Sequence, residues 1–439
     1  MLLYVLGVLI MVVGIGASIA LHELGHFVPA KLFGVRVAQF MIGFGPTLFS
    51  RKRGGTEFGL KALPLGGYIS MAGMFPPATP GEQPRTASTG FFQTLVQDAR
   101  TASADTIAPG DDDRTFYRLP IWKRIIIMLG GPFMNLVIAV VLYAVVLCGF
   151  GVSQQSTTIG SVSACVLPAT STSQECAAGD PEAPGAAAGF LPGDTILEID
   201  GTAITSWEQA TALIRAAPGD ALSVVVERAG DPVTLTATPI LSERYVLTDA
   251  GTVEEDANGV AMTQEVGFLG IGAATEVVQQ PVTAVLPAVG DNVARVAQLI
   301  VTLPQRLVEV AQAAFGSGER DPNGPISVVG VGRVAGEIAS IDSVPVADRA
   351  SALIGIVASL NVALLVFNLI PLLPLDGGHV AGALFEGVRR FFARLFGRRD
   401  PGPVDTAKLI PLTLAVVAIL GASSLLLIYA DLVNPISLF

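Results

Sequence analysis

Charged residues are scarce in this chain. Asp, Glu, Lys and Arg make up 14% of its 439 residues, whereas hydrophobic residues make up 51%. This balance argues against an ordinary soluble protein and predicts a polytopic membrane protein with soluble inserts. Four long runs carry no charge, and each reaches or exceeds the roughly 20 residues that a membrane-spanning helix needs. They are Leu2–Leu21, Ile125–Phe150, Ala352–Leu375 and Leu409–Ala430.

The first of these runs lacks the features of a secretory signal peptide. It has no basic flank and no small-residue cleavage site, and its apolar stretch is too long. We therefore expect a retained membrane helix. A fifth apolar stretch, Pro281–Phe315, is interrupted by Asp291, Arg295, Arg306 and Glu309, so we expect an amphipathic helix that lies on the membrane.

Lysine is absent from residues 151–349, which contain 8 Arg and 24 Asp or Glu. Basic residues gather instead near the two ends of the first connecting segment, within 31–53 and 114–124, and within 389–408. By the positive-inside rule these segments are cytoplasmic, so the acidic segment and both termini lie outside. The formal net charge of −11 also argues against nucleic-acid binding.

Cysteine is rare as well, with three in the chain. Cys148 lies in the second apolar run, where we expect it to act as a small apolar residue. Cys165 and Cys176 lie in the outside segment, where a disulfide is chemically stable. Two cysteines this close in sequence leave their pairing open.

Histidine occurs three times, and two of the three stand in the sequence HELGH, at His22 and His26. On a helix these residues are one turn apart and face the same way. This pattern binds zinc in metalloproteases, with the intervening Glu23 as general base. A chance pair on a soluble amphipathic helix is the alternative, but the preceding Leu2–Leu21 is apolar on every face. Ionisable side chains at the end of such a run favour a functional site.

A third ligand is predicted at Asp376, in the sequence NLIPLLPLDGGH of residues 368–379. The prolines interrupt the helix and free backbone groups, which must be covered by protein. The charge distribution places Asp376 and the histidine pair at the cytoplasmic ends of their spans. Two histidines and one carboxylate leave a fourth zinc position open for water, as in catalytic sites. His379 remains either a spare ligand or a hydrogen-bonding neighbour of Asp376.

Residues 35–75 are rich in glycine and β-forming residues. The GFGP sequence at 43–46 predicts a turn, and Leu60–Met71 predicts a pair of strands around Gly66-Gly67. Next to a proteolytic centre, the unpaired edge of such a sheet offers a place for an extended substrate. An ordinary juxtamembrane hairpin is the alternative.

Two further segments connect these motifs. Residues 76–113 contain few large apolar residues, so we expect a disordered cytoplasmic insertion over 76–118. The second span opens with GGPFMN at 130–135. Glycine permits close helix approach, and a membrane-embedded Pro and Asn require partners within the bundle. We expect this face to pack against the helix that carries the histidines.

The outside segment divides into two parts. Residues 157–242 predict short strands and one helix, and the sequence GFLPGDTILEIDG at 189–201 resembles a PDZ domain. Its carboxylate-binding loop would lie near Ala183–Ala188, and a generic small β-rich domain is the alternative. Residues 243–349 would form a membrane-proximal segment that contains the amphipathic helix.

The predicted fold is a polytopic α-helical membrane protein with four transmembrane helices, a membrane-associated β-hairpin and one extracytoplasmic PDZ-like α+β domain. The expected segments are 1–34 (first transmembrane helix), 35–75 (β-region), 76–118 (insertion), 119–150 (second transmembrane helix), 157–242 (PDZ-like domain), 243–349 (membrane-proximal segment), 350–387 (third transmembrane helix), 388–408 (basic cytoplasmic loop) and 409–430 (fourth transmembrane helix).

The motifs HELGH, GFGP, GGPFMN and NLIPLLPLDGGH, in this order and with the PDZ-like segment between the second and third spans, resemble the site-2 protease family of intramembrane zinc metalloproteases. The resemblance covers nearly the whole chain. It implies that His22, His26 and Asp376 bind one zinc ion and that Glu23 is the catalytic base. The residues expected to bind substrate are Asn368, which would hold the substrate backbone or the oxyanion, Asn135, and Gly43, Phe44 and Gly45 in a re-entrant β-loop that presents the substrate strand.

Within that family the chain is similar to the bacterial regulator-of-sigma-E proteases, and its single PDZ-like domain and polar insertion resemble actinobacterial members. This implies a protein of the bacterial plasma (inner) membrane with its active site toward the cytoplasm. Its substrates would be single-span membrane proteins such as anti-sigma factors, cut after an upstream site-1 protease has acted. A peptidase for remnant signal peptides and a non-catalytic PDZ membrane scaffold are the alternatives.

Overall fold

The computed structural model describes residues 1–76, 91–107, 112–167, 176–177, 179–246, 253–254, 261–316, 318, 320–321 and 324–436. The chain divides into two compact units. The first, here called the helical unit, combines Met1–Phe150 with Gln280–Phe439. The second, here called the β-rich unit, is Gly151–Gln279.

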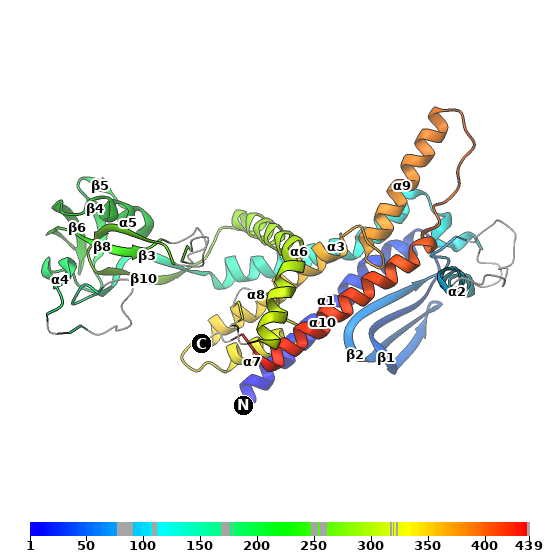
Figure 1. Ribbon diagram of the computed structural model, residues 1–439, viewed down its shortest axis with the longest axis horizontal. Coiled ribbons are helices and arrows are strands. Elements are labelled where there is room, and N and C mark those ends of the chain that lie inside the picture. The colour runs from blue at the N-terminus through cyan, green and yellow to red at the C-terminus, as the bar shows by residue number, and fades with distance from the viewer. Residues whose placement is uncertain are drawn as a thin grey trace. The chain divides into compact units, whose positions relative to one another are not determined.

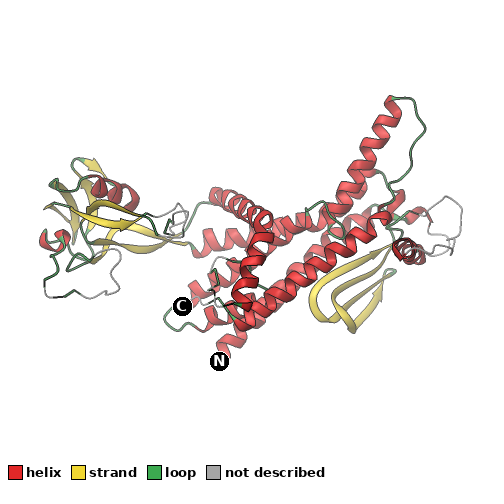
Figure 2. Cartoon of the chain, viewed as in Figure 1, coloured by secondary structure: helices red, strands yellow, loops and turns green. Residues whose placement is uncertain are grey.

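Long helices build the helical unit (Figures 1 and 2). They are α1 (Leu2–Leu32), α3 (Ile121–Ala144), α6 (Val285–Phe315), α7 (Val328–Ser340), α8 (Val346–Asn368), α9 (Asp376–Leu395) and α10 (Ile410–Val433). Among the described residues, five segments are long and apolar enough to cross a bilayer: Leu2–Leu32, Ile121–Phe150, Val282–Phe315, Val346–Asn368 and Thr406–Val433. Four of them were predicted as spans. The other one contains α6, which meets the same criteria of length and composition although its charged residues predict a helix on the surface.

Helices α1 and α3 touch through glycine. A Cβ atom on Gly25 would lie 2.2 Å from the carbonyl oxygen of Gly130, and a Cβ atom on Gly130 would lie 2.0 Å from that of Gly25. Both distances are far below an ordinary contact, so only glycine fits at either position. The predicted packing of the glycine-rich start of the second span against the histidine-bearing helix is therefore confirmed.

Beside these helices, β1 (Val37–Arg53) and β2 (Thr56–Met71) form one antiparallel hairpin. The hairpin curls over itself, because Gln39–Ile42 pair with Glu57–Leu60 and also with Gly67–Ser70. The last of these stretches therefore lies at the border of the curled sheet.

The prediction of two strands within Leu60–Met71 is wrong, because β2 runs through this stretch without a break. Gly66 has a φ of 92° and bends the strand instead of ending it. A glycine in this left-handed region can mark either a bend or a turn, and the sequence alone does not distinguish the two.

The predicted disordered insertion over 76–118 is wrong where the structure describes it, and the rest of that segment lies outside the described residues. Phe91–Asp105 form α2, and Phe116 is buried. The Ser103 hydroxyl accepts a hydrogen bond of 3.0 Å from the backbone N–H of Phe75. The composition pointed to disorder because the segment contains few large apolar residues. Hydrogen bonds to hydroxyl groups help to anchor the segment instead.

The predicted third helix over 350–387 is in fact two helices. α8 ends at Asn368 and α9 begins at Asp376, with Pro371 and Pro374 between them. Each proline lacks a backbone donor and clashes with the preceding turn, and two of them three residues apart favour a break in the helix here. The break places Asp376 in the first turn of a new helix.

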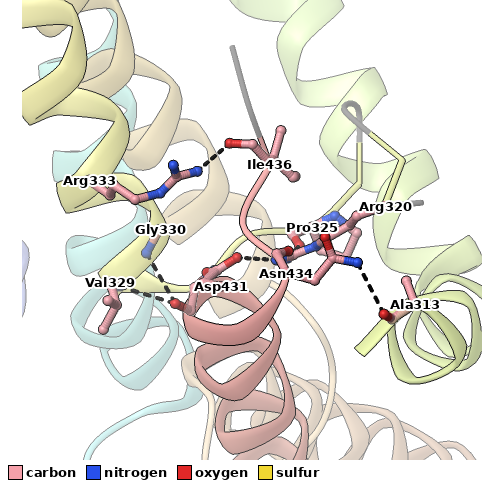
Figure 3. Close-up of polar contacts among 10 residues, drawn as sticks. Ala313, Arg320, Pro325, Val329, Gly330, Arg333, Asp431, Asn434 and Ile436 are labelled. Atoms are coloured by element: carbon pink, nitrogen blue, oxygen red, sulfur yellow. Dashed lines mark hydrogen bonds and ion pairs between the residues drawn. The ribbon is translucent and has the colours of Figure 1, made fainter. Parts of the chain in front are cut away.

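A buried polar cluster ties the end of α10 to α6 and α7. Arg320 and Asp431 form an ion pair, and each side chain is only 2% exposed. Asp431 also accepts a hydrogen bond of 2.6 Å from the backbone N–H of Ser327, which caps α7. Nearby, the Asn434 amide donates to the carbonyl oxygen of Ala313 at 3.1 Å (Figure 3). Removal of either ion-pair partner would leave a buried charge uncompensated. The cluster therefore holds the end of α10 next to the end of α6 and the start of α7.

The β-rich unit contains a sheet of order β10–β3–β4–β6–β7, with β5 beside β4, and a two-stranded sheet of β8 and β9. The strands are β3 (Val152–Val162), β4 (Thr195–Ile199), β5 (Thr202–Ala203), β6 (Leu222–Arg228), β7 (Asp231–Ala237), β8 (Ile240–Tyr245), β9 (Thr263–Phe268) and β10 (Ile271–Val278). The helices are α4 (Pro184–Ala187) and α5 (Trp207–Ala216). Inward-facing residues of the strands, with Phe190 and α5, form the apolar core.

The β-rich unit extends beyond the predicted boundaries of 157–242. Residues 243–279 were assigned to the membrane-proximal segment, but they contain β9, which pairs with β8, and β10, which pairs with β3. β10 and β3 are far apart in sequence, so local patterns do not reveal their pairing. In the same unit, Cys165 and Cys176 form a disulfide.

Asp194 anchors the loop before β4. Its side chain is 1% exposed and accepts two hydrogen bonds of 2.7 Å from the Arg228 guanidinium. The backbone N–H of Leu191 donates a third bond of 2.9 Å. The contact with Arg228 holds the pKa of the Asp194 carboxyl below its usual value, although burial acts in the opposite direction.

We predict that Asp194→Asn lowers the free energy of unfolding of the β-rich unit by about 1–3 kcal/mol, because Arg228 loses its anionic partner. Since the folded pKa of Asp194 is lowered, its stabilising effect is present above its unfolded pKa and disappears as the pH falls through the folded value. Hydrogen exchange of the backbone amides of 151–279 in the full-length protein measures both effects. The difference between wild type and variant should shrink on acidification, and equal protection of the two at neutral pH would contradict the assignment.

Candidate metal centre

Two histidines face each other one turn apart on α1. The Nε2 atoms of His22 and His26 lie 3.2 Å apart, and the two rings meet edge to face with centroids 4.8 Å apart. α1 is continuous from Leu2 to Leu32, so the spacing of four residues holds both rings on one face. The helix therefore delivers two nitrogen ligands to one place.

Asp376 at the start of α9 completes the group. Its Oδ2 atom lies 3.4 Å from His22 Nε2 and 3.3 Å from His26 Nε2. One possible ligand atom from each of the three residues lies within 4.8 Å of the others. Asp376 Oδ2 is buried and has no hydrogen-bond partner among the described residues. A buried carboxylate oxygen between two imidazole nitrogens fits a divalent cation, and this set of donors with one open position is typical of catalytic zinc.

Both imidazoles are oriented from behind by α3. His26 Nδ1 lies 2.7 Å from the carbonyl oxygen of Ile127, and His22 Nδ1 lies 3.0 Å from the side-chain amide of Asn135. A carbonyl oxygen can only accept a hydrogen bond, so His26 Nδ1 must carry the hydrogen. The Nε2 atom of His26 then has a free lone pair for a metal. His22 adopts the same tautomer when the Asn135 oxygen faces it. Asn135 is completely buried, so the structure places it behind a histidine, whereas the sequence placed it among the substrate-binding residues.

The backbone of α3 also passes directly beside the ligand atoms. A Cβ atom on Gly131 would lie 2.2 Å from His26 Nε2 and 2.7 Å from His22 Nε2. Any larger residue would fill the space between the two nitrogens. Sequence reasoning missed this role, and its one signal was the Gly130-Gly131 pair, which predicted helix packing only.

Glu23 lies between the histidines in sequence and is 8% exposed. β2 passes next to it, because a Cβ atom on Gly67 would lie 3.0 Å from Glu23 Cγ and 3.0 Å from a side-chain carbon of Ile19. The hairpin and the glutamate are therefore in close contact. The sequence predicted a hairpin near the centre but did not identify Gly67 as the point of contact.

The GFGP sequence bends β1. Gly43 and Gly45 have φ values of 88° and 85°, which favour glycine. Phe44 between them is exposed and stacks on Tyr68, with ring centroids 6.2 Å apart. The predicted turn is therefore a bend within one long strand.

Two more predicted residues flank the break between α8 and α9. Asn368 is the last residue of α8 and is half-buried. His379 follows Asp376 by one helical turn, and it does not belong to the metal-ligand group found within the described part of the chain. The structure thus brings together His22, His26 and Asp376 and leaves His379 outside the set.

Comparison with known proteins gives consistent matches along the chain. The model of peptidase family M50 matches residues 10–397. Zinc metalloprotease Rip1 of Mycobacterium tuberculosis is 32% identical over 448 residues, which is 100% of both chains. Rip1 of Mycolicibacterium smegmatis is 32% identical over 454 residues, again 100% of both chains. Metalloprotease MmpA of Caulobacter vibrioides is 31% identical over 399 residues, or 88% of each chain.

We predict that Gly131→Ala lowers the zinc affinity of the purified protein by at least about tenfold, because the new methyl group would occupy the space between the ligand nitrogens. Competition with a zinc chelator measures this affinity. Gly16→Ala is the matched control, because Gly16 is also a helical glycine and a Cβ atom there would meet no atom within 4 Å. An affinity that is equal in Gly131→Ala and wild type would show that the metal lies elsewhere.

Proposed function

Because the chain belongs to peptidase family M50, the site-2 protease family, we propose that it hydrolyses peptide bonds within or near the membrane-spanning segment of single-span membrane proteins. The chain is a membrane zinc metalloprotease, so the alternative of a non-catalytic scaffold falls. The observation that carries the proposal is the convergence of His22, His26 and Asp376 beside apolar helices, with an unsatisfied carboxylate oxygen between two imidazoles.

We assign His22, His26 and Asp376 as the zinc ligands and Glu23 as the general base. When bound, zinc supplies a Lewis acid that acidifies water and polarises a carbonyl group. The Glu23 carboxylate takes a proton from the attacking water and delivers it to the amide nitrogen that leaves. The contacts behind the imidazoles keep both rings in the tautomer that a metal needs.

The substrate is extended at the scissile bond, because a helical peptide bond is shielded by its own turn. Within the described part of the chain, Gly67–Ser70 pair with Gln39–Ile42 and with no other strand. Gly67, the first residue of this border stretch of the hairpin, lies in contact with Glu23. These contacts support addition of the substrate as a strand along this border, next to the general base. The bend at Gly43–Gly45 would present it, and Asn368 would hold its backbone or the oxyanion.

The substrates we propose are single-span proteins such as anti-sigma factors, after a first protease has cut them outside the membrane. A site beside apolar helices supports this, since such a substrate reaches it through the bilayer. We also propose that both termini and the β-rich unit lie outside the cytoplasm and that the site lies toward it, because basic residues gather in the segments near the site. Remnant signal peptides would undergo the same chemistry, and membrane proteomics of cells with and without active enzyme separates the two substrate classes.

A groove in the β-rich unit supports a role in substrate selection. A cavity of about 380 Å³ is lined by residues of α5, by Arg244 and Tyr245, and by Val266–Ile271. None of the lining residues is acidic, whereas Arg215 and Arg244 contribute positive charge. The chemistry of the groove therefore favours an anionic ligand with apolar side chains.

Arg244 has no carboxylate partner among the described residues. Its guanidinium carbon lies 3.7 Å from the centroid of the Phe268 ring, and the group donates to the carbonyl oxygen of Leu167 at 3.0 Å. Within the described part of the chain its Nε atom is buried and has no hydrogen-bond partner, and burial lowers the pKa of the Arg244 guanidinium. We propose that the groove is the peptide site of a PDZ-like domain and that Arg244 receives the carboxylate of a newly made C-terminus. β10 pairs only with β3 in the described sheet, so its other edge is available for the peptide strand.

This assignment moves the carboxylate-binding loop. The sequence placed the loop near Ala183–Ala188, but this stretch contains the short helix α4. The backbone N–H of Gly185 donates to the carbonyl oxygen of Leu269 at 2.7 Å, so α4 supports the groove from behind. The stretch that lines the groove is instead Val266–Gly270, which is the end of β9 and the turn before β10.

We predict that Glu23→Gln keeps the zinc ion and the fold but slows cleavage by at least about 100-fold, because the ligands remain and only the base is lost. Zinc analysis and an assay with a single-span substrate in vesicles measure the two properties on one preparation. Glu309→Gln, which removes an exposed carboxylate on α6, is the control and should cleave like wild type. Zinc binding together with wild-type cleavage in Glu23→Gln would remove Glu23 from the mechanism.

For the groove, we predict that the full-length protein binds a fluorescent peptide with a free, apolar C-terminus about tenfold more tightly than the same peptide with a C-terminal amide. Arg244→Gln should abolish that difference, because the carboxylate then loses the guanidinium assigned to receive it, while Arg215 still lines the groove. Fluorescence anisotropy measures both affinities, and the amidated peptide serves as the matched control. The same preference in wild type and Arg244→Gln would place the carboxylate elsewhere.

A further inference from the structure

Helix α9 has two halves with different surroundings. Its first half is packed, because Gly377 and Gly378 leave no room for a side chain against the preceding loop. Glu386 is completely buried and accepts a hydrogen bond of 2.5 Å from Arg124 of α3. From Val388 onward the side chains are exposed or half-buried, and in Figure 1 this end of α9 extends away from the other helices.

The exposed side of α9 is a continuous apolar stripe. It consists of Leu384, Phe385, Val388, Phe391, Phe392, Leu395 and Phe396, whose exposed fractions range from 49% to 68%. Their spacing follows the helical repeat, so the seven side chains lie along one side of the helix. Exposure of an apolar stripe of this size to water is unfavourable, so the stripe requires a covering partner.

Arginines border this stripe. Arg389 and Arg394 lie on opposite sides of it, since helical residues advance by about 100° each. Arg398 lies in the segment beyond the end of the helix, after Phe396 and Gly397. None of the three forms an ion pair with a described carboxylate, whereas Arg390, on the packed side, pairs with Glu386 at 3.1 Å. The border charges are therefore available to an external anion.

We infer that the apolar stripe of α9 and its bordering arginines bind the membrane surface on the side of the metal centre through anionic phospholipids. Apolar side chains enter the boundary of headgroups and acyl chains, and arginines on either side meet phosphate groups, as in basic amphipathic helices. A second copy of the chain fits this surface poorly, because it would bring the same arginines against one another.

The surface has a consequence for the metal centre, and this step rests on the proposed function. The same helix that carries the stripe begins at Asp376, the carboxylate that completes the ligand group. The helix is held to α3 at Glu386, between its two ends. Lipid contact at the far half therefore restricts the orientation of α9 and favours the position of Asp376 next to the histidines. Anionic lipid should strengthen both zinc retention and cleavage.

The full-length protein tests the inference in vesicles of phosphatidylcholine with and without phosphatidylglycerol. A nitroxide label at Phe392→Cys, in a Cys148→Ser background, reports burial in the bilayer through its accessibility to oxygen and to a water-soluble nickel complex. Zinc loss to a chelator and substrate cleavage are measured on unlabelled protein in the same vesicles. The variants are Arg394→Gln/Arg398→Gln, the charge-preserving Arg394→Lys/Arg398→Lys, and the control Arg295→Gln/Arg306→Gln, which removes two arginines of α6.

In wild type, phosphatidylglycerol should bury the label and slow zinc loss, and high salt should reverse both effects. Phosphatidylglycerol should slow zinc loss by about fivefold for each arginine, or by at most about 30-fold for the pair. Arg394→Gln/Arg398→Gln should lose the response, whereas the lysine variant and the control should keep it.

Two results overturn the inference. One is a label whose accessibility to oxygen and to the nickel complex is the same in both lipids. The other is a control variant that loses the response to phosphatidylglycerol as fully as Arg394→Gln/Arg398→Gln does. Cleavage and zinc binding that are normal and independent of lipid would leave the proposed function standing without this surface. A label that enters only anionic bilayers, in a protein that neither binds zinc nor cleaves, would sustain the surface and refute the proposed function.

Discussion

Direct backbone contact between α1 and α3 is the constraint on which the metal centre depends. Gly25 and Gly130 allow the two helices to meet without side chains between them. The same close approach brings Gly131 next to the ligand nitrogens and the carbonyl oxygen of Ile127 behind His26. A wider separation would remove the acceptor that sets the tautomer of His26. The chemistry of the site therefore begins with two residues that carry no functional group at all.

The three residues that we propose as ligands could be picked out from the sequence because each is marked by local chemistry. His22 and His26 stand one helical turn apart after an uncharged run, and Asp376 stands after prolines that end a helix. The residues that support them could not be predicted in the same way. The role of Asn135 depends on how α3 crosses α1, and the contact of Gly67 with Glu23 depends on how the hairpin curls. Such long-range geometry leaves no periodic pattern in the sequence.

The fold shows the same division between local and long-range information. Hydropathy predicted four of the five long apolar segments as spans, and the charge distribution marked the acidic segment that we propose lies outside the cytoplasm. The predicted end of the β-rich unit at residue 242 is too early, because β10 pairs with β3 from more than a hundred residues away in the sequence. Residues 91–105 form a helix held partly by the Ser103 hydroxyl, and composition gave no sign of it. Likewise, the stripe on α9 follows a helical period, but its exposure is visible only once α9 is seen to leave the bundle.

The central claim is that two imidazoles from α1 and one carboxylate from α9 share one zinc ion. X-ray absorption at the zinc K edge of the purified full-length protein tests it most directly. A centre of two imidazoles and one carboxylate should give light-atom neighbours only, at about 2.0–2.1 Å, with the multiple-scattering pattern of two imidazoles. Three imidazoles would replace Asp376 by His379 as the third ligand. A sulfur neighbour at about 2.3 Å would point to cysteine, and either result would contradict the centre described here.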